Sequence, residues 1–380
     1  MRKFVISMIA AFGVIALGLI LIMVAVIRSG GISFSSHTFG SGADLVKTTN
    51  LSMDGISSLS LEYSSDDIIF YQSNTEELIL KEYMNITPKE EELTQIRQTS
   101  SEIRLSGGKR YWQNWVLNHF YGYVEVYLPE GYQGSISPST SSGNIETDLV
   151  LNLSELNASC TSGDLTFNEV YAEDIRAAAS SGNINFAKAE GKRSFATSSG
   201  NIEVNGGNGD TDASSTSGNI TIGNGIGSLS AAASSGNITV EGMDGKKDIE
   251  TTSGEIRLSD CGGYTSATAS SGNIEISELG GAGDFESTSG NIEVSFTDEL
   301  AQSNEDIRAN ASSGEISLQL PGSLSFNFTA RTSSGDIDTF FDDSLNYKKD
   351  GDYAEGTVGA SPAFDLDTAT SSGNITIEQR

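Results

Sequence analysis

The segments Ser198-Ser-Gly-Asn-Ile-Glu-Val204, Thr216-Ser-Gly-Asn-Ile-Thr-Ile222 and Ser234-Ser-Gly-Asn-Ile-Thr-Val240 are copies of one motif, each 18 residues after the last. The motif is Ser-Gly, then Asn, Asp or Glu, then Ile or Leu. Its glycines are Gly143, Gly163, Gly182, Gly200, Gly218, Gly236, Gly254, Gly272, Gly290, Gly314, Gly335 and Gly373. From Gly182 to Gly290 every interval is 18 residues. A constant period of this length is typical of stacked repeats.

Around each glycine the residues alternate in character. After it come an apolar, a polar and an apolar residue, as in Ile202, Glu203 and Val204, the period-2 pattern of a strand with one buried face. The strand before the glycine ends in small residues, such as Ser215. The alternation of inward-facing and outward-facing residues along this strand is interrupted at the Ser-Gly pair. This interruption predicts a corner there. We expect the glycine to supply the positive φ that such a corner often needs.

Two arrangements fit these strands. In a parallel β-helix each repeat is one coil stacked on the last, whereas in an antiparallel meander each repeat is a hairpin. Columns of identical residues favour the β-helix, in which Asn183, Asn201, Asn219 and Asn237 would form a hydrogen-bonded ladder. The predicted fold class is therefore all-β, a parallel β-helix (β-solenoid) with coils of about 18 residues after one transmembrane helix.

The amino-terminal residues predict that helix. Met1, Arg2 and Lys3 precede an uncharged, mostly apolar run of 24 residues from Phe4 to Ile27. About 20 residues cross a membrane as a helix, and a cleaved signal peptide has a shorter apolar core. The positive-inside rule places the amino terminus in the cytoplasm and the remainder outside the cell. We therefore expect a single-pass cell-membrane protein with an extracellular carboxy-terminal part.

The composition limits the kinds of molecule that the chain can bind. Lys and Arg number 22 against 51 Asp and Glu, a formal net charge of -29, so nucleic acid is an unsuitable partner. Cys160 and Cys261 should lie several coils apart, which predicts two unpaired, buried thiols.

Residues 50–134 lack the repeat and contain two features of interest. Thr87-Pro-Lys-Glu90 has the form of a capping box and predicts a short helix to about Gln98. An aromatic cluster follows, from which the candidate partner-binding residues are Trp112, Trp115, Tyr121 and Tyr123. These aromatics either cap the first coil or form an exposed platform that stacks on sugar rings or a partner protein.

The chain thus divides into a cytoplasmic stub and transmembrane anchor (1–28), a linker (29–49), a β-rich capping region with an aromatic insertion (50–134) and the solenoid repeats (135–380). The motif is missing between Gly335 and Gly373, and the last strand ends inside a repeat. We expect either a folded-over segment from 338–365 or a partner chain to cover that edge.

The segment Tyr123-Val-Glu-Val-Tyr-Leu-Pro-Glu-Gly-Tyr132, followed by Thr140-Ser-Ser-Gly-Asn-Ile145, resembles the bacterial family named "putative adhesin". The resemblance covers approximately residues 50–380, and the insertion at 87–118 departs from it. It implies a membrane-anchored β-solenoid at the cell envelope. No catalytic or ligand-binding residues are established for that family, so none carry over.

No catalytic, cofactor-binding or metal-binding residue is predicted, because the two histidines, His37 and His119, have no nucleophile or metal-site pattern around them. The chain is therefore expected not to be an enzyme. We predict a membrane-anchored, adhesin-like interaction module that binds a glycan or protein of the cell envelope. The alternatives are a regulatory or structural envelope-stress protein that acts through a membrane partner and a polysaccharide-cleaving β-helix enzyme.

Overall fold

The computed structural model describes residues 42–109, 120–341, 344–347 and 352–380. Residues 43–380 form one compact unit with its own core. The predicted anchor lies outside the described residues, and no helix among those described is long and apolar enough to cross a membrane. The first strand, β1 (Asp44–Ser52), begins within the range predicted as a linker.

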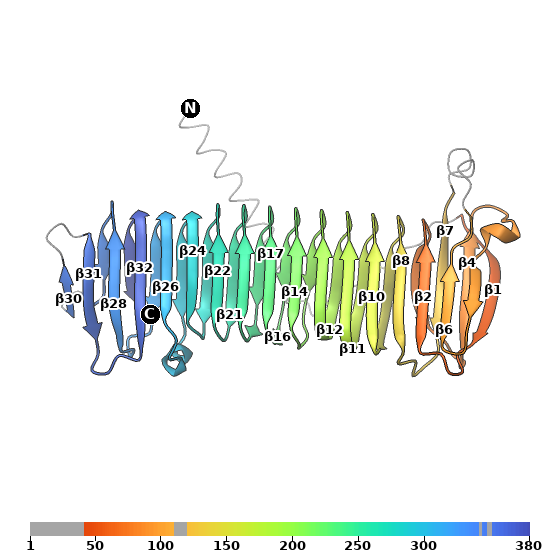
Figure 1. Cartoon of the computed structure of the whole chain (residues 1–380), viewed down its shortest axis with the longest axis horizontal. Helices are drawn as coiled ribbons and strands as arrows, with labels where there is room; N and C mark the ends of the chain where they lie inside the picture. Colours follow the sequence, from red (N-terminus) through yellow and green to blue (C-terminus); the bar gives the residue numbers. More distant parts are fainter. Residues whose placement is uncertain (1–41, 110–119, 342–343, 348–351) are drawn as a thin grey trace, which may run out of the picture. The chain divides into compact units, whose positions relative to one another are not determined.

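The strands form two columns that enclose the core (Figure 1). The column before the corner contains β2 (Ser58–Tyr63), β6 (Glu102–Ser106), β8 (Ser135–Thr140), β10 (Glu155–Cys160), β14 (Thr211–Ser215), β17 (Leu229–Ala233), β20 (Lys247–Thr251), β22 (Thr265–Ala269), β24 (Gly283–Ser289), β26 (Ile307–Ser313), β28 (Phe326–Thr332) and β32 (Phe364–Ser372).

The column after the corner contains β3 (Asp67–Gln72), β7 (Gly122–Leu128), β9 (Ile145–Asn152), β13 (Ile202–Val204), β15 (Ile220–Ile222), β18 (Ile238–Glu241), β21 (Ile256–Cys261), β23 (Ile274–Leu279), β25 (Ile292–Phe296), β27 (Ile316–Leu320), β29 (Ile337–Thr339) and β33 (Ile375–Gln379). Two long strands, β11 (Leu165–Ala179) and β12 (Ile184–Thr197), bend from one column into the other. The other elements are β4 (Glu77–Met84), β5 (Gln95–Gln98), β16 (Gly225–Ile226), β19 (Met243–Asp244), β30 (Leu345–Tyr347), β31 (Tyr353–Val358) and the short 3-10 helices η1 (Glu90–Glu92) and η2 (Asp298–Gln302).

The repeats stack in parallel and in register, so the predicted β-helix is confirmed and the meander is wrong. Ile202 pairs with Ile220, and Ile220 pairs with Ile238. All three are fully buried. Each buried isoleucine contributes about 1.5–3 kcal/mol of hydrophobic stabilisation. The column of identical isoleucines follows from the in-register stacking, because every coil must present the same apolar shape to the next.

The asparagine ladder is also confirmed, and its bonds run from side chain to backbone. The Asn201 side-chain oxygen accepts from the Asn219 backbone N–H at 2.9 Å, and Asn219 accepts from Asn237 in the same way. Asp164 is an equivalent member, since its carboxylate accepts from the Asn183 backbone N–H at 2.7 Å. A coil with Asn or Asp at this position therefore satisfies a corner N–H of the next coil.

The motif glycines are required for a different reason from the one predicted. Those from Gly143 to Gly335 do not have positive φ, and only Gly373, at 153°, does. Positive φ occurs instead in the glycine-rich turns, as at Gly207. A Cβ on Gly218 would lie closer than 3.0 Å to the carbonyl oxygen of Gly200, and the other motif glycines show the same conflict with a neighbouring coil. Close stacking of backbones therefore selects glycine at the corner.

The coils at the two ends do not stack in chain order. At the carboxy-terminal end β32 lies between β26 and β28, and β33 lies between β27 and β29. At the amino-terminal end β2 lies between β6 and β8, and β3 between β7 and β9. The last strand is thus paired on both sides, which the sequence did not predict.

The segment between Gly335 and Gly373 folds over the outermost coil, whereas it was expected to cover the edge of the last strand. Strand β31 pairs antiparallel with β28, and β30 pairs with β31. Phe341 is buried and meets Phe326 and Phe328 edge-on at 5.4 and 5.2 Å. This aromatic contact closes the end of the core.

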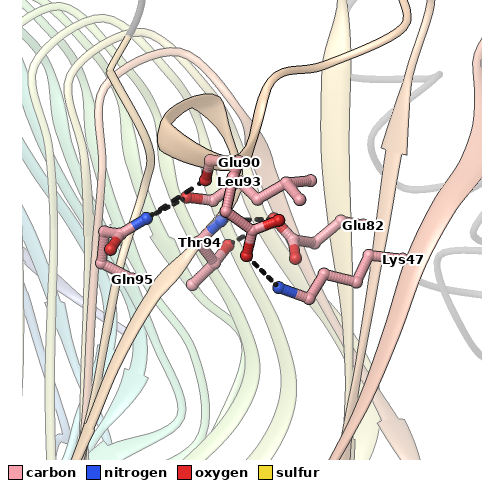
Figure 2. Close-up of polar contacts among 6 residues, drawn as sticks. All are labelled: Lys47, Glu82, Glu90, Leu93, Thr94 and Gln95. Atoms are coloured by element: carbon pink, nitrogen blue, oxygen red, sulfur yellow. Dashed lines mark hydrogen bonds and ion pairs between the residues drawn. The ribbon is translucent and has the colours of Figure 1, made fainter.

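The predicted helix at 87–98 is wrong. Only η1 is helical, and its N-cap is Lys89, because Glu92 closes the capping box on Lys89. Glu82, fully buried on β4, accepts the Thr94 N–H and hydroxyl, both at 2.7 Å (Figure 2). These bonds hold the chain extended after η1, and Gln95 begins strand β5.

Both cysteines are buried and free, which confirms their prediction.

Candidate interaction surface

Four tyrosines lie together on the outward face of three neighbouring strands near the amino-terminal end of the stack. Tyr83 on β4 is in register with Tyr123 on β7, and their rings stack at 4.4 Å with an interplanar angle of 6°. Tyr127 on β7 is in register with Tyr71 on β3, with ring centroids 5.3 Å apart. The alternate residues of β7, Val124 and Val126, are buried on the inward face. We call these four residues the tyrosine face.

Glu125 lies at the centre of the tyrosine face. Its carboxylate accepts from the hydroxyls of Tyr83 at 3.0 Å and Tyr127 at 2.9 Å. Lys81 donates to the Tyr127 hydroxyl at 2.9 Å, and its ammonium lies 4.2 Å from the centre of that ring. The face therefore combines a cation–π contact with charge-assisted hydrogen bonds.

Electrostatics keep these groups in their donor forms. Burial, followed by the neighbouring Glu125 carboxylate, raises the pKa of the Tyr71, Tyr83 and Tyr123 phenols. The hydrogen bond to Tyr127 raises the pKa of Lys81. The Tyr71, Tyr83 and Tyr123 phenols and the Lys81 ammonium therefore stay protonated at neutral pH.

Of the four predicted binding residues, two are described. Tyr123 lies within the tyrosine face, and Tyr121 lies 6.1 Å from Tyr123 between ring centroids. Trp112 and Trp115 lie outside the described residues.

Sequence reasoning missed Tyr71, Tyr83 and Tyr127, together with Lys81 and Glu125. The alternation of Tyr123, Glu125 and Tyr127 was a usable signal, because every second residue of a strand shares a face. The pairing of β7 with β4 and β3 could not be predicted from that pattern.

A hollow of about 770 Å³ lies along the turns of the later coils. Its lining includes Asp244, Asp260 and Glu278, and Arg380 pairs with Glu278 at 2.7 Å. Among the described residues no group of three or more Asp, Glu, His or Cys is placed to hold a metal ion. Both histidines lie outside the described residues.

A stack of parallel coils in register defines the β-solenoid class of repeat proteins. The chain belongs to the Toastrack DUF4097 family, whose model matches residues 56–260 and 227–378. No curated protein matches the chain.

Two solved structures are similar to the chain at low scores. A "putative cell adhesion protein" from Clostridium sporogenes is 12% identical, with 89% of this chain and all of that chain covered and a TM-score of 0.26. A "putative adhesin" from Bacteroides fragilis is also 12% identical, with 87% and 96% covered and a TM-score of 0.19.

Proposed function

We propose that this chain is a membrane-anchored interaction module of the cell envelope, adhesin-like in action, and that the tyrosine face is its recognition surface. The observation that carries the proposal is the group of part-exposed polar aromatic side chains on the outward face of the parallel stack. Tyr71 is 38% exposed there. Tyrosine combines a large apolar ring with a hydrogen-bonding hydroxyl, a combination enriched at binding surfaces.

The proposed location rests on the apolar run from Phe4 to Ile27, with Arg2 and Lys3 before it. A protease added to intact cells should degrade residues 43–380 and spare the amino terminus. Complete protection of the chain would contradict the extracellular location.

A sedimentation assay with isolated cell walls tests the function. Full-length chain in detergent should co-sediment with the walls, and Tyr71→Ala should reduce the bound fraction several-fold, because an exposed aromatic contributes by direct contact. The matched control is Tyr353→Ala, which removes a part-exposed tyrosine from β31 at the other end of the stack.

Failure to sediment would overturn the proposal. A membrane protein that co-purifies with the chain through residues 4–27 would instead support the regulatory or structural alternative. Release of reducing ends from wall polysaccharide by the chain would support the enzyme alternative and contradict the expectation that no catalysis occurs.

A further inference from the structure

The hydrogen-bonding unit centred on Tyr127 occurs a second time on the same face of the sheet. In the first unit Glu125-Val-Tyr127 of β7 contacts Lys81 of β4. In the second, Glu169-Val-Tyr171 of β11 contacts Lys188 of β12.

The two units share their geometry. The Tyr171 hydroxyl donates to Glu169 at 2.8 Å, and Lys188 donates to that hydroxyl at 3.2 Å. The Lys188 ammonium lies 5.0 Å from the centre of the ring. In each unit the lysine is in register with the glutamate of the adjacent strand, Lys81 with Glu125 and Lys188 with Glu169.

The two units flank a central strip made by β3 and β9. The pairing order across the sheet is β4, β7, β3, β9, β11 and β12. The two lysines therefore lie on the outermost of these six strands, β4 and β12. The strands that carry Tyr127 and Tyr171, β7 and β11, lie next to them on the inner side. Five strand spacings of about 4.8 Å give a surface roughly 24 Å long. The second unit is displaced along the strands, because Glu169 is in register with Val150 beyond a bulge in β9.

The central strip exposes the apolar surface of this region. Tyr71 is 38% exposed and Val150 is 52% exposed. Leu151, the next residue of β9, is buried, so Val150 lies on the outward face, where it is in register with Glu169. Asp148 of β9 is also exposed and supplies a hydrogen-bond acceptor.

Charge limits the ligand that this surface can bind. Its two lysines, Lys81 and Lys188, are already paired with carboxylates, and Asp148 and Glu146 add negative charge. The whole chain carries a net charge of -29, so anionic polymers are repelled. A ligand with apolar patches and many hydroxyl groups satisfies both the exposed rings and the carboxylate acceptors.

We propose that this surface binds a chain of neutral pyranose sugars that crosses the six strands along the stack, an inference that rests on the proposed function and names its ligand class. Sugar rings pack on Tyr71 and Val150, and their hydroxyls donate to Asp148 and to the carboxylates of the two Glu-Val-Tyr units. The strand spacing of about 4.8 Å lets successive sugar rings meet successive strands.

The test is titration of the full-length chain in detergent with neutral β-linked glucose and N-acetylglucosamine oligomers of increasing length, and with polygalacturonate as the anionic probe. Affinity should rise with oligomer length until the surface is filled and should be insensitive to salt. Polygalacturonate should not bind. Val150→Asp should weaken binding about tenfold, because it places a charge where a sugar ring packs.

Ile226→Asp is the matched control. Ile226 is 63% exposed on β16, so the same charge is introduced at a second exposed apolar position without disturbing the core. Its affinity for the oligomers should be unchanged.

Equal losses in Val150→Asp and Ile226→Asp would overturn the site. Wall sedimentation that depends on Tyr71, together with no binding of any neutral oligomer, would overturn the sugar ligand and leave the proposed function intact. No sedimentation with walls would overturn the proposed function itself, whereas oligomer binding that is lost in Val150→Asp alone would still support this surface.

Discussion

At each motif glycine, from Gly163 to Gly373, the α-carbon lies against the backbone of the neighbouring coil. Steric exclusion of a methyl group therefore accounts for the glycine at these positions. The asparagine beside it acts through the reach of its side chain, since one side-chain oxygen bonds the N–H of the next coil. The glycine thus permits close packing of the coils, and the adjacent asparagine supplies the hydrogen bond between them.

Gly218→Ala should destabilise the stack by about 1–3 kcal/mol, because the added methyl group cannot fit beside the Gly200 carbonyl. Gly206→Ala is the control, since its Cβ would meet only the Asn224 carbonyl at 3.4 Å and its φ is not positive. Urea denaturation followed by circular dichroism measures both. Equal stability of the two variants would contradict the packing explanation.

Thr94→Val should cost about 1.5–3 kcal/mol, because it removes the hydroxyl that donates to the buried Glu82 carboxylate and is hydrogen-bonded to the Tyr63 hydroxyl at 3.0 Å. The other Glu82 oxygen has no hydrogen-bond partner among the described residues, so no second bond of that oxygen compensates for the lost one. Thr48→Val on the exposed side of β1 is the control. A smaller loss in Thr94→Val than in the control would refute the role of this bond.

At the scale of single elements, β2 and β3 form a coil that the motif did not identify. Their corner is Ser64-Ser-Asp-Asp67, in which Asp66 and Asp67 occupy the glycine and asparagine positions. Asp67 joins the ladder, since its carboxylate accepts the Asn144 N–H at 2.8 Å.

Asp67→Asn should stabilise the protein at neutral pH. Burial raises the pKa of Asp67, so the folded state binds its proton more tightly than the unfolded state does. Stability is therefore lost as pH rises from the unfolded to the folded pKa, and the penalty is complete above the latter. Asparagine avoids this penalty and keeps the acceptor. Its advantage, measured by thermal unfolding, should disappear in acid; an advantage that persists there would contradict this explanation.

The coil formed by β32 and β33 holds the outermost coil in place. Deletion of residues 364–380 should abolish hydrogen-exchange protection in β28, although β28 itself is retained, because β32 is its only parallel partner among the described strands. Protection in β20 and β22, several coils away, should be unchanged. Persistent protection in β28 would show that its pairing with β31 is sufficient.

For the whole molecule, the balance of charge is dominated by carboxylates. Glu275 and Glu293 are directly in register on adjacent strands. Arg257 pairs with Glu275 at 3.2 Å, and no ion pair forms at Glu293 within the described part of the chain. Like charges in this position are destabilising, and the net charge of -29 adds a general repulsion.

Added sodium chloride should therefore raise the melting temperature of the chain, because screening weakens repulsion more than it weakens the few surface ion pairs. Thermal unfolding at increasing salt, with sucrose as a non-ionic control, measures the effect. A fall in melting temperature with salt would mean that ion pairs dominate.

The sequence by itself determined the coil. The 18-residue period, the isoleucine column and the asparagine ladder are local patterns, and stacking like on like is the arrangement that buries all of them. The buried, unpaired cysteines followed from the same period.

Only the tertiary structure decided the order of the end coils, the reason for the glycines and the composition of the tyrosine face. Each depends on contacts between segments far apart in the chain, such as Tyr83 with Tyr123 or Ile316 with Ile375. Periodicity fixes which side of a strand a residue occupies, but the choice of neighbouring strand is made by the energy of packing the whole stack.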